Sequence, residues 1–132
     1  ATGRPTDLLR RPIVSKSLLI ISRQPPWSGP GAREALDIAL AGGAFDLPIG
    51  MLFLDDGVFQ LSNDQQPGAL QLKDLGANLQ ALPMFGVERL YASQRSLAER
   101  GLSDAELNLA VERLDDSALT TLLDHYDQVI TL

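Results

Sequence analysis

Apolar runs alternate with helix-patterned segments along most of this chain, and this alternation restricts the possible folds more than any other feature. Continuous apolar strands are typical of a parallel sheet that is covered on both faces. One run alternates apolar with polar or small residues, so it is expected nearer an edge. We predict an α/β fold in three layers, with a mainly parallel, five-stranded sheet between helices. The runs lie at 17–22, 49–54, 87–92, around 107–111 (the alternating one) and at 128–132.

Helical periodicity predicts helices between these runs. Apolar residues recur at three- and four-residue spacing over 32–43 and 72–82, and 96–100 is predicted as a short helix closed by Gly101. The segment 58–61 is either a short helical turn or a loop. A last helix is capped by Asp115 or Asp116. Its inward face is expected to hold Ala118, Leu119, Leu122, Leu123 and Tyr126.

The chain length fits one domain. Of 132 residues, 45% are hydrophobic and 21% are charged, which is ordinary for a folded domain. We interpret residues 1–15 as an N-terminal extension and 16–132 as a single domain. The longest apolar stretch, 47–54, is much shorter than the roughly 20 residues of a membrane-spanning helix. The N-terminus does not resemble a secretion signal, so we expect a cytoplasmic protein without a membrane partner.

The charge distribution argues against direct nucleic acid binding. The net charge is −6, yet residues 1–33 hold six of the eleven Lys and Arg residues and only one acid. From Glu34 onward five basic residues stand against sixteen acids, which leaves a charge of −11. Nucleic acid binding needs a basic patch with interleaved aromatic residues. We therefore expect no direct contact with RNA or DNA.

Several kinds of chemistry are excluded or disfavoured by residue type. The chain contains no cysteine, which excludes disulfides, thiolate metal sites and covalent thiol chemistry by its own side chains. The one histidine, His125, lies in the last turn of a predicted helix, where a structural role is favoured over metal binding or acid–base chemistry. No serine hydrolase motif is present. We expect no catalytic residues, no metal and no cofactor.

Candidate contact residues lie in the loops after the predicted strands, because ligands of open α/β sheets collect beyond the carboxyl ends of the strands. Asp55 and Asp56 could hold a hard cation or accept a phosphoryl group, but a turn with helix capping is favoured. Phe59 is either an exposed partner contact or a core aromatic residue. Trp27 is either a lid over the sheet edge or an interface anchor. The loop 28–31 lacks the P-loop and dinucleotide motifs, so a turn is favoured over phosphate binding. A binding or subunit role is the default.

Four segments together resemble the TusC/DsrF family of sulfur-relay proteins. The string at 56–61, DGVFQL, is fairly specific, and the order and spacing of all four segments agree with the family. The likeness runs from Ser17 to Leu132 and leaves the first fifteen residues uncovered. The segments are 31–41, 54–61, 96–102 and 125–132.

The resemblance implies a DsrE-like α/β/α fold and membership of a hetero-oligomer built from two copies each of three paralogous subunits. The partners would then be a TusB-like and a TusD-like subunit, of which the second carries the persulfide cysteine. In one branch of the family such complexes pass persulfide sulfur onward for 2-thiouridine formation at the tRNA wobble position. In another branch they serve sulfur oxidation.

The persulfide cysteine of the sister subunit lies in a strand-to-helix turn shortly before an Arg-Gly pair, and the matching position here is Ser93. A serine hydroxyl does not accept sulfur as a thiolate does. The resemblance therefore implies a non-catalytic subunit for tRNA thiolation, with Trp27, Asp55, Asp56, Phe59 and Ser93 as interface candidates. The alternatives are the sulfur-oxidation branch, a small-ligand or nucleotide-binding domain, and an enzyme that uses Asp55 and Asp56 with a metal.

Overall fold

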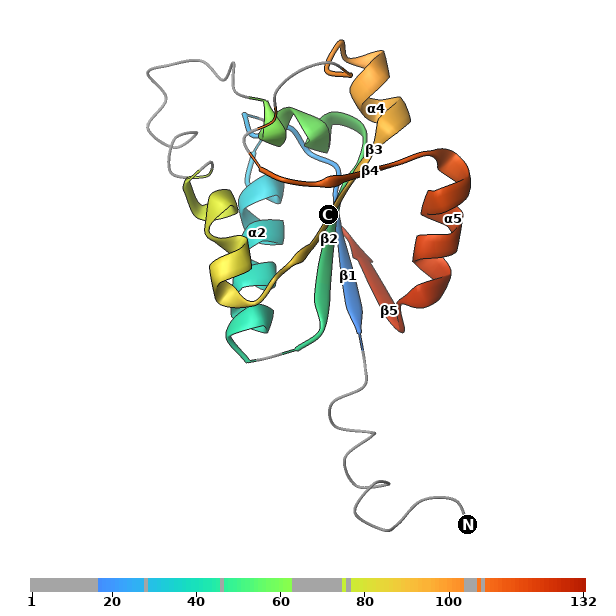
Figure 1. Ribbon diagram of the computed structural model, residues 1–132. Coiled ribbons are helices and arrows are strands. Elements are labelled where there is room, and N and C mark those ends of the chain that lie inside the picture. Colours follow the sequence, from blue (N-terminus) through green and yellow to red (C-terminus); the bar gives the residue numbers. More distant parts are fainter. Residues whose placement is uncertain are drawn as a thin grey trace, which may run out of the picture.

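A computed structural model describes residues 17–27, 29–45, 47–62, 75, 77–103, 107 and 109–132. Its strands form one five-stranded sheet in the order β4-β3-β2-β1-β5, and every pairing in it is parallel (Figure 1). This confirms the predicted α/β class. The predicted extension, residues 1–15, lies outside the described residues. The strands are β1 (Leu18–Ser22), β2 (Ile49–Phe53), β3 (Arg89–Ser93), β4 (Glu112–Leu114) and β5 (Gln128–Thr131).

Helices cover the two faces of the sheet unequally. In Figure 1, α2 and the helical residues 77–80 lie on one side of the sheet, whereas α5 is the helix on the other side among the residues that the structure describes. No helix among the described residues is long and apolar enough to cross a membrane. The helices are α2 (Gly31–Ala44), α4 (Gln94–Glu99) and α5 (Asp116–His125), and the 3-10 helices are η1 (Asp55–Leu61) and η2 (Leu82–Phe85).

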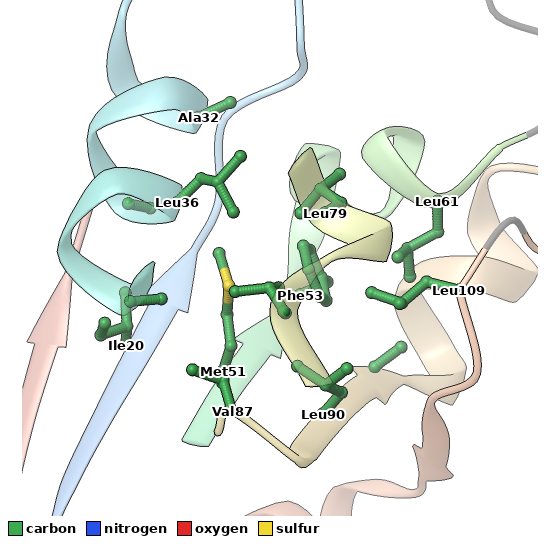
Figure 2. Close-up of a cluster of buried hydrophobic side chains, with 14 of the residues drawn as sticks. Ile20, Ala32, Leu36, Met51, Phe53, Leu61, Leu79, Val87, Leu90 and Leu109 are labelled. Carbon is green, nitrogen blue, oxygen red and sulfur yellow. The ribbon is translucent and has the colours of Figure 1, made fainter. Parts of the chain in front are cut away.

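The larger core lies on the α2 side of the sheet. Figure 2 shows Met51 and Phe53 of β2 in this cluster together with Leu36 of α2, and all three side chains are fully buried. Successive strand residues point to opposite faces. Ile20 of β1 therefore lies in the larger core, whereas Leu19 and Ile21 face α5. The smaller core there consists of Leu19, Ile21, Leu52, Tyr91 and Leu122.

The predicted position of the fourth strand is wrong. Leu107 forms an isolated antiparallel bridge with Ser62, and Leu109 is buried in the larger core as part of a loop. The strand itself starts at Glu112 and has only three residues, at the edge of the sheet. The apolar residues before the strand, such as Leu109, therefore pack in the core and do not belong to the strand. The predicted edge position of the strand is confirmed.

Helix α5 is the predicted last helix, with one correction. The Asp115 carboxylate accepts a hydrogen bond of 2.8 Å from the Ala118 backbone amide, so Asp115 is the N-cap. Leu122 points into the smaller core as predicted, but Leu123 is 40% exposed, so its predicted inward position is wrong. The inward stripe is therefore narrow: Leu122 is buried, and Ala118, Leu119 and Tyr126 are half-buried.

Candidate functional site

The loops after β1, β2 and β3 meet at the carboxyl edge of the sheet. Arg23 follows β1 and Asp55 follows β2, and Arg23 Nε donates a hydrogen bond of 2.8 Å to Asp55 Oδ2. A second guanidinium nitrogen of Arg23 lies 2.6 Å from the same oxygen. Both side chains are about half exposed, so solvent screens this ion pair. The main effect of this ion pair is to hold the two loops in a fixed position relative to each other.

Asp55 has an unusual backbone conformation. Its φ of 53° is in the left-handed region, which aspartate enters more easily than most residues. The Asp55 amide donates a hydrogen bond of 2.9 Å to Ser96 Oγ, so helix α4 fixes the loop after β2 from the other side. The loop is therefore held at both its side chain and its backbone.

Ser93 is an internal residue of this edge. It is the last residue of β3 and the N-cap of α4, and its Oγ accepts a hydrogen bond of 3.1 Å from the Ser96 amide. Only 2% of Ser93 is exposed. The structure therefore places Ser93 beneath the surface, and a direct partner contact by its side chain stays a prediction.

Asp56 has an arginine partner as well. Arg100 Nε lies 2.9 Å from Asp56 Oδ1, and Arg100 also donates a hydrogen bond of 3.2 Å to the Ser96 carbonyl oxygen. The predicted turn at Asp55 and Asp56 is present as the start of η1, but neither carboxylate caps it. Among the residues that the structure describes, no group of three or more His, Asp or Glu side chains is arranged to hold a metal ion.

The aromatic candidates form a pair at the same edge. The rings of Trp27 and Phe59 have centroids 5.2 Å apart at an interplanar angle of 49°. Trp27 is 61% exposed, whereas Phe59 is half-buried below it. Contacts of this kind stabilise by about 0.5–1.5 kcal/mol beyond burial. Phe59 is thus neither a core residue nor a freely exposed one; it supports Trp27, which remains available to a partner.

Two residues of the 56–61 string that were not among the predicted contact residues hold this edge together. The buried Gln60 amide nitrogen donates hydrogen bonds of 2.7 Å to Ser22 Oγ and 3.0 Å to the Gln24 carbonyl oxygen. Gly57 lies so close to β1 that a Cβ there would be 2.0 Å from the Ser22 carbonyl oxygen. A polar glutamine between Phe59 and Leu61, in the otherwise apolar end of η1, was the available signal.

A hollow of about 520 Å³ lies near the amino-terminal ends of the strands, opposite the carboxyl edge and next to the C-terminal end of α5. The Tyr91 and Tyr126 hydroxyl groups are 3.4 Å apart there. The ring of Tyr126 lies directly over Gly50, because a Cβ on Gly50 would be 2.1 Å from the Tyr126 hydroxyl oxygen. Burial, followed by the contact with the Tyr91 hydroxyl, raises the pKa of the Tyr126 phenol well above its ordinary value.

This raised pKa predicts a loss of stability in alkali. The unfolded chain ionises Tyr126 near its ordinary pKa of about 10, whereas the folded chain keeps the phenol protonated. The contribution of the protonated Tyr126 phenol to the free energy of unfolding is complete below about pH 10 and is lost as the pH rises above this value. We expect the free energy of unfolding to fall more steeply for the wild-type chain than for Tyr126→Phe between about pH 9 and 11. Urea titrations across this range measure both slopes, and equal slopes would contradict the expectation.

Comparisons with known proteins place the chain among relatives of known fold. The profile of the DsrE/DsrF-like family matches residues 16–132. The "Protein TusC homolog" of Pseudomonas aeruginosa is 75% identical over 119 residues, which cover 90% of this chain and 100% of that protein. The "Intracellular sulfur oxidation protein DsrF" of Allochromatium vinosum is 30% identical over 132 residues, which cover 89% of this chain and 97% of that protein.

The solved structures agree with the fold. The crystal structure of the ychN protein from E. coli superposes with a TM-score of 0.72 at 20% identity, and the match covers 89% of this chain and 99% of that one. At this identity the likeness concerns the fold alone, and it supports the DsrE-like arrangement of five strands. From the profile match and the identity to the relatives, the chain belongs to the DsrE/DsrF-like family and, within it, to the TusC/DsrF group.

Proposed function

We propose that this chain is a non-catalytic subunit of a sulfur-relay hetero-oligomer in the cytoplasm. The observation that carries the proposal is the 75% identity to a TusC homolog over the whole of that relative, in a chain that has no cysteine. A persulfide forms only on a thiol sulfur, so sulfur bound by the assembly is carried by a sister subunit.

The environment of Ser93 supports a structural role for this turn. Its hydroxyl is buried and caps α4, so the turn is used to fix the fold rather than to present a reactive group. Ser96, one turn on, also accepts from the Asp55 amide. The turn and the loop after β2 thus form a rigid platform, which suits a subunit that shapes the surroundings of a sister's cysteine.

The contact residues of this platform are Trp27, Phe59, Asp55 and Asp56. Trp27 is held on Phe59 at a fixed angle, so little side-chain freedom is lost when a partner covers it. Arg23 and Arg100 neutralise the two carboxylates, so the edge has little net charge to repel a partner. The partners are a TusB-like subunit and a TusD-like subunit, of which the second supplies the thiol.

We assign the complex to tRNA wobble thiolation in preference to sulfur oxidation. The identity is 75% to the TusC homolog and 30% to the DsrF protein of intracellular sulfur oxidation. Sulfur oxidation remains the second candidate because the DsrF relative matches over 97% of its own length.

Co-expression with the two sister subunits tests the proposal. Size-exclusion chromatography with light scattering is expected to show a complex of about six chains that does not form when this chain is left out. In the same preparations, transfer of labelled sulfur from the TusD-like thiol to an acceptor should depend on this chain. Full transfer without it, or a monomer that ignores both sisters, would contradict the proposal.

A further inference from the structure

The segment from β4 onward, residues 112–132, buries very little of itself. Helix α5, β4 and β5 together contain a single buried residue, Leu122, and every residue of β5 is exposed. Helix α2, on the other face of the same sheet, buries six residues. The strand residues beneath α5 are buried, but α5 itself buries one residue, and β5 is exposed on both of its faces.

Large apolar side chains remain exposed on α5 and on the edge strand β5. Leu123 on α5 is 40% exposed and Val129 on β5 is 42% exposed. Val129 pairs with Leu19, whose side chain lies in the smaller core, so Val129 points to the same side of the sheet as α5. We call Leu123, Asp124, Tyr126 and Val129, with the adjoining hollow, the α5 face. Exposed apolar side chains that gather on one face are typical of an interaction site.

The β5 edge beside it lacks the usual protection of an exposed strand. Gln128–Thr131 contains no charge and no proline, whereas the other edge strand is three residues long and carries Glu112 and Arg113. Edge strands of monomeric proteins are commonly short or charged, which prevents association. The contrast between the two edges indicates that the β5 side is covered in the working protein.

The charge of this region identifies the kind of partner. Residues 112–132 hold five acids and one arginine. Among the described residues, Asp124 of α5 has no ion-pair partner, whereas Asp116 at the start of α5 pairs with Arg95, and both carboxylates at the carboxyl edge of the sheet have an arginine partner. The hollow of about 520 Å³ beside α5 is lined by Glu88 as well as by Arg89. A second copy would bring two acidic surfaces together, so a basic partner fits better. The acids of this region are Glu112, Asp115, Asp116, Asp124 and Asp127.

We propose that the α5 face binds a sister subunit whose contact surface is an apolar patch ringed by Lys and Arg. This face is separate from the carboxyl edge of the sheet, where Trp27 lies. This inference rests on the proposed subunit role, because the partner that it places on the α5 face is a sister subunit. Leu123 and Val129 meet the apolar centre, Asp124 pairs with a partner cation, and the hollow receives a long basic side chain along the Tyr126 ring.

Matched substitutions on opposite faces test this assignment. Leu123→Gln on α5 is compared with Ile38→Gln on α2, because both residues are helical and are 40% and 37% exposed. Asp124→Lys is compared with Asp37→Lys, which reverses a charge on α2. Each variant is co-expressed with the TusB-like and TusD-like subunits, and complex formation is measured by light scattering over a dilution series at low and high salt.

We expect Leu123→Gln and Asp124→Lys to weaken assembly by about tenfold or more, and the two α2 variants to stay within about twofold of wild type. Wild-type assembly should weaken with rising salt, and that of Asp124→Lys should weaken less. All four substitutions are at exposed positions, so melting temperatures should change little.

Three results would overturn the assignment. If the complex forms and ignores both α5 variants, the proposed function stands and the α5 face is not the docking surface. If the isolated chain self-associates and Leu123→Gln abolishes this, the occupant is a second copy. If no complex forms with either sister, the proposed function fails and the assignment of this face fails with it.

Discussion

Gly57→Ala is expected to lower the free energy of unfolding by about 3 kcal/mol, because the new methyl group would collide with backbone that has no room to move. The added Cβ would be 2.0 Å from the Ser22 carbonyl oxygen and 2.8 Å from its carbon. That oxygen also accepts the Leu54 amide hydrogen bond of 3.1 Å, which joins the ends of β1 and β2. Relieving the collision would therefore separate the two strands where Arg23 and Asp55 must meet.

Urea unfolding followed by circular dichroism measures this loss. Gly101→Ala is the control, because Gly101 has a φ of 72° and an added Cβ would have no neighbour within 4 Å. This control reports the strain of alanine at a positive φ without any collision, about 1 kcal/mol, whereas Gly57 has no positive φ. A Gly57→Ala chain no less stable than the Gly101→Ala chain would show that the close approach to Ser22 does not matter.

Trp27→Ala is expected to weaken assembly with the sister subunits by about thirtyfold or more, the size of effect seen for central aromatic anchors. The stability of the isolated chain should hardly change, because Trp27 is 61% exposed and contacts Phe59 from outside. Trp27→Phe should restore part of the loss, since a smaller ring can still stack on Phe59. Titration of the TusD-like and TusB-like subunits into the labelled chain measures the affinity.

Phe45→Ala is the matched control for this experiment. Phe45 is an aromatic residue that is 81% exposed, and it follows α2, away from the loops that carry Trp27 and Phe59. It should leave assembly unchanged. Equal losses for Trp27→Ala and Phe45→Ala would mean that general surface hydrophobicity, and not the aromatic pair, determines binding.

The sequence patterns located the strands well where burial is continuous. β1 and β2 begin and end within one residue of their predicted bounds, because every position of 19–22 and 49–53 is buried. β4 was misplaced because Glu112 and Arg113 are exposed and carry no apolar signal, while Leu109 nearby belongs to the core. The apolar pattern of the sequence thus locates a strand only where the strand lies in the interior of the sheet.

The site was predicted as a location but not as a set of contacts. Parallel topology places Asp55 and Ser93 at one edge of the sheet, which the strand order confirms. The pairing of Arg23 with Asp55 joins two loops 32 residues apart in sequence, and neither this contact nor the left-handed conformation of Asp55 is encoded by sequence periodicity. The burial of Ser93 likewise follows from its hydrogen bond to the Ser96 amide, a contact that depends on the geometry of the turn.

The strand order also has a consequence for biosynthesis. β1 lies between β2, which follows soon after it, and β5, which is the last of the five strands to be made. While the ribosome is still translating, β1 therefore has an open hydrogen-bonding edge, with Leu19 and Ile21 beside it. Pairing of distant segments is slow and leaves such edges exposed to aggregation. The sheet is consequently complete only after β5 has emerged, which favours association with other chains after the synthesis of β5 rather than before it.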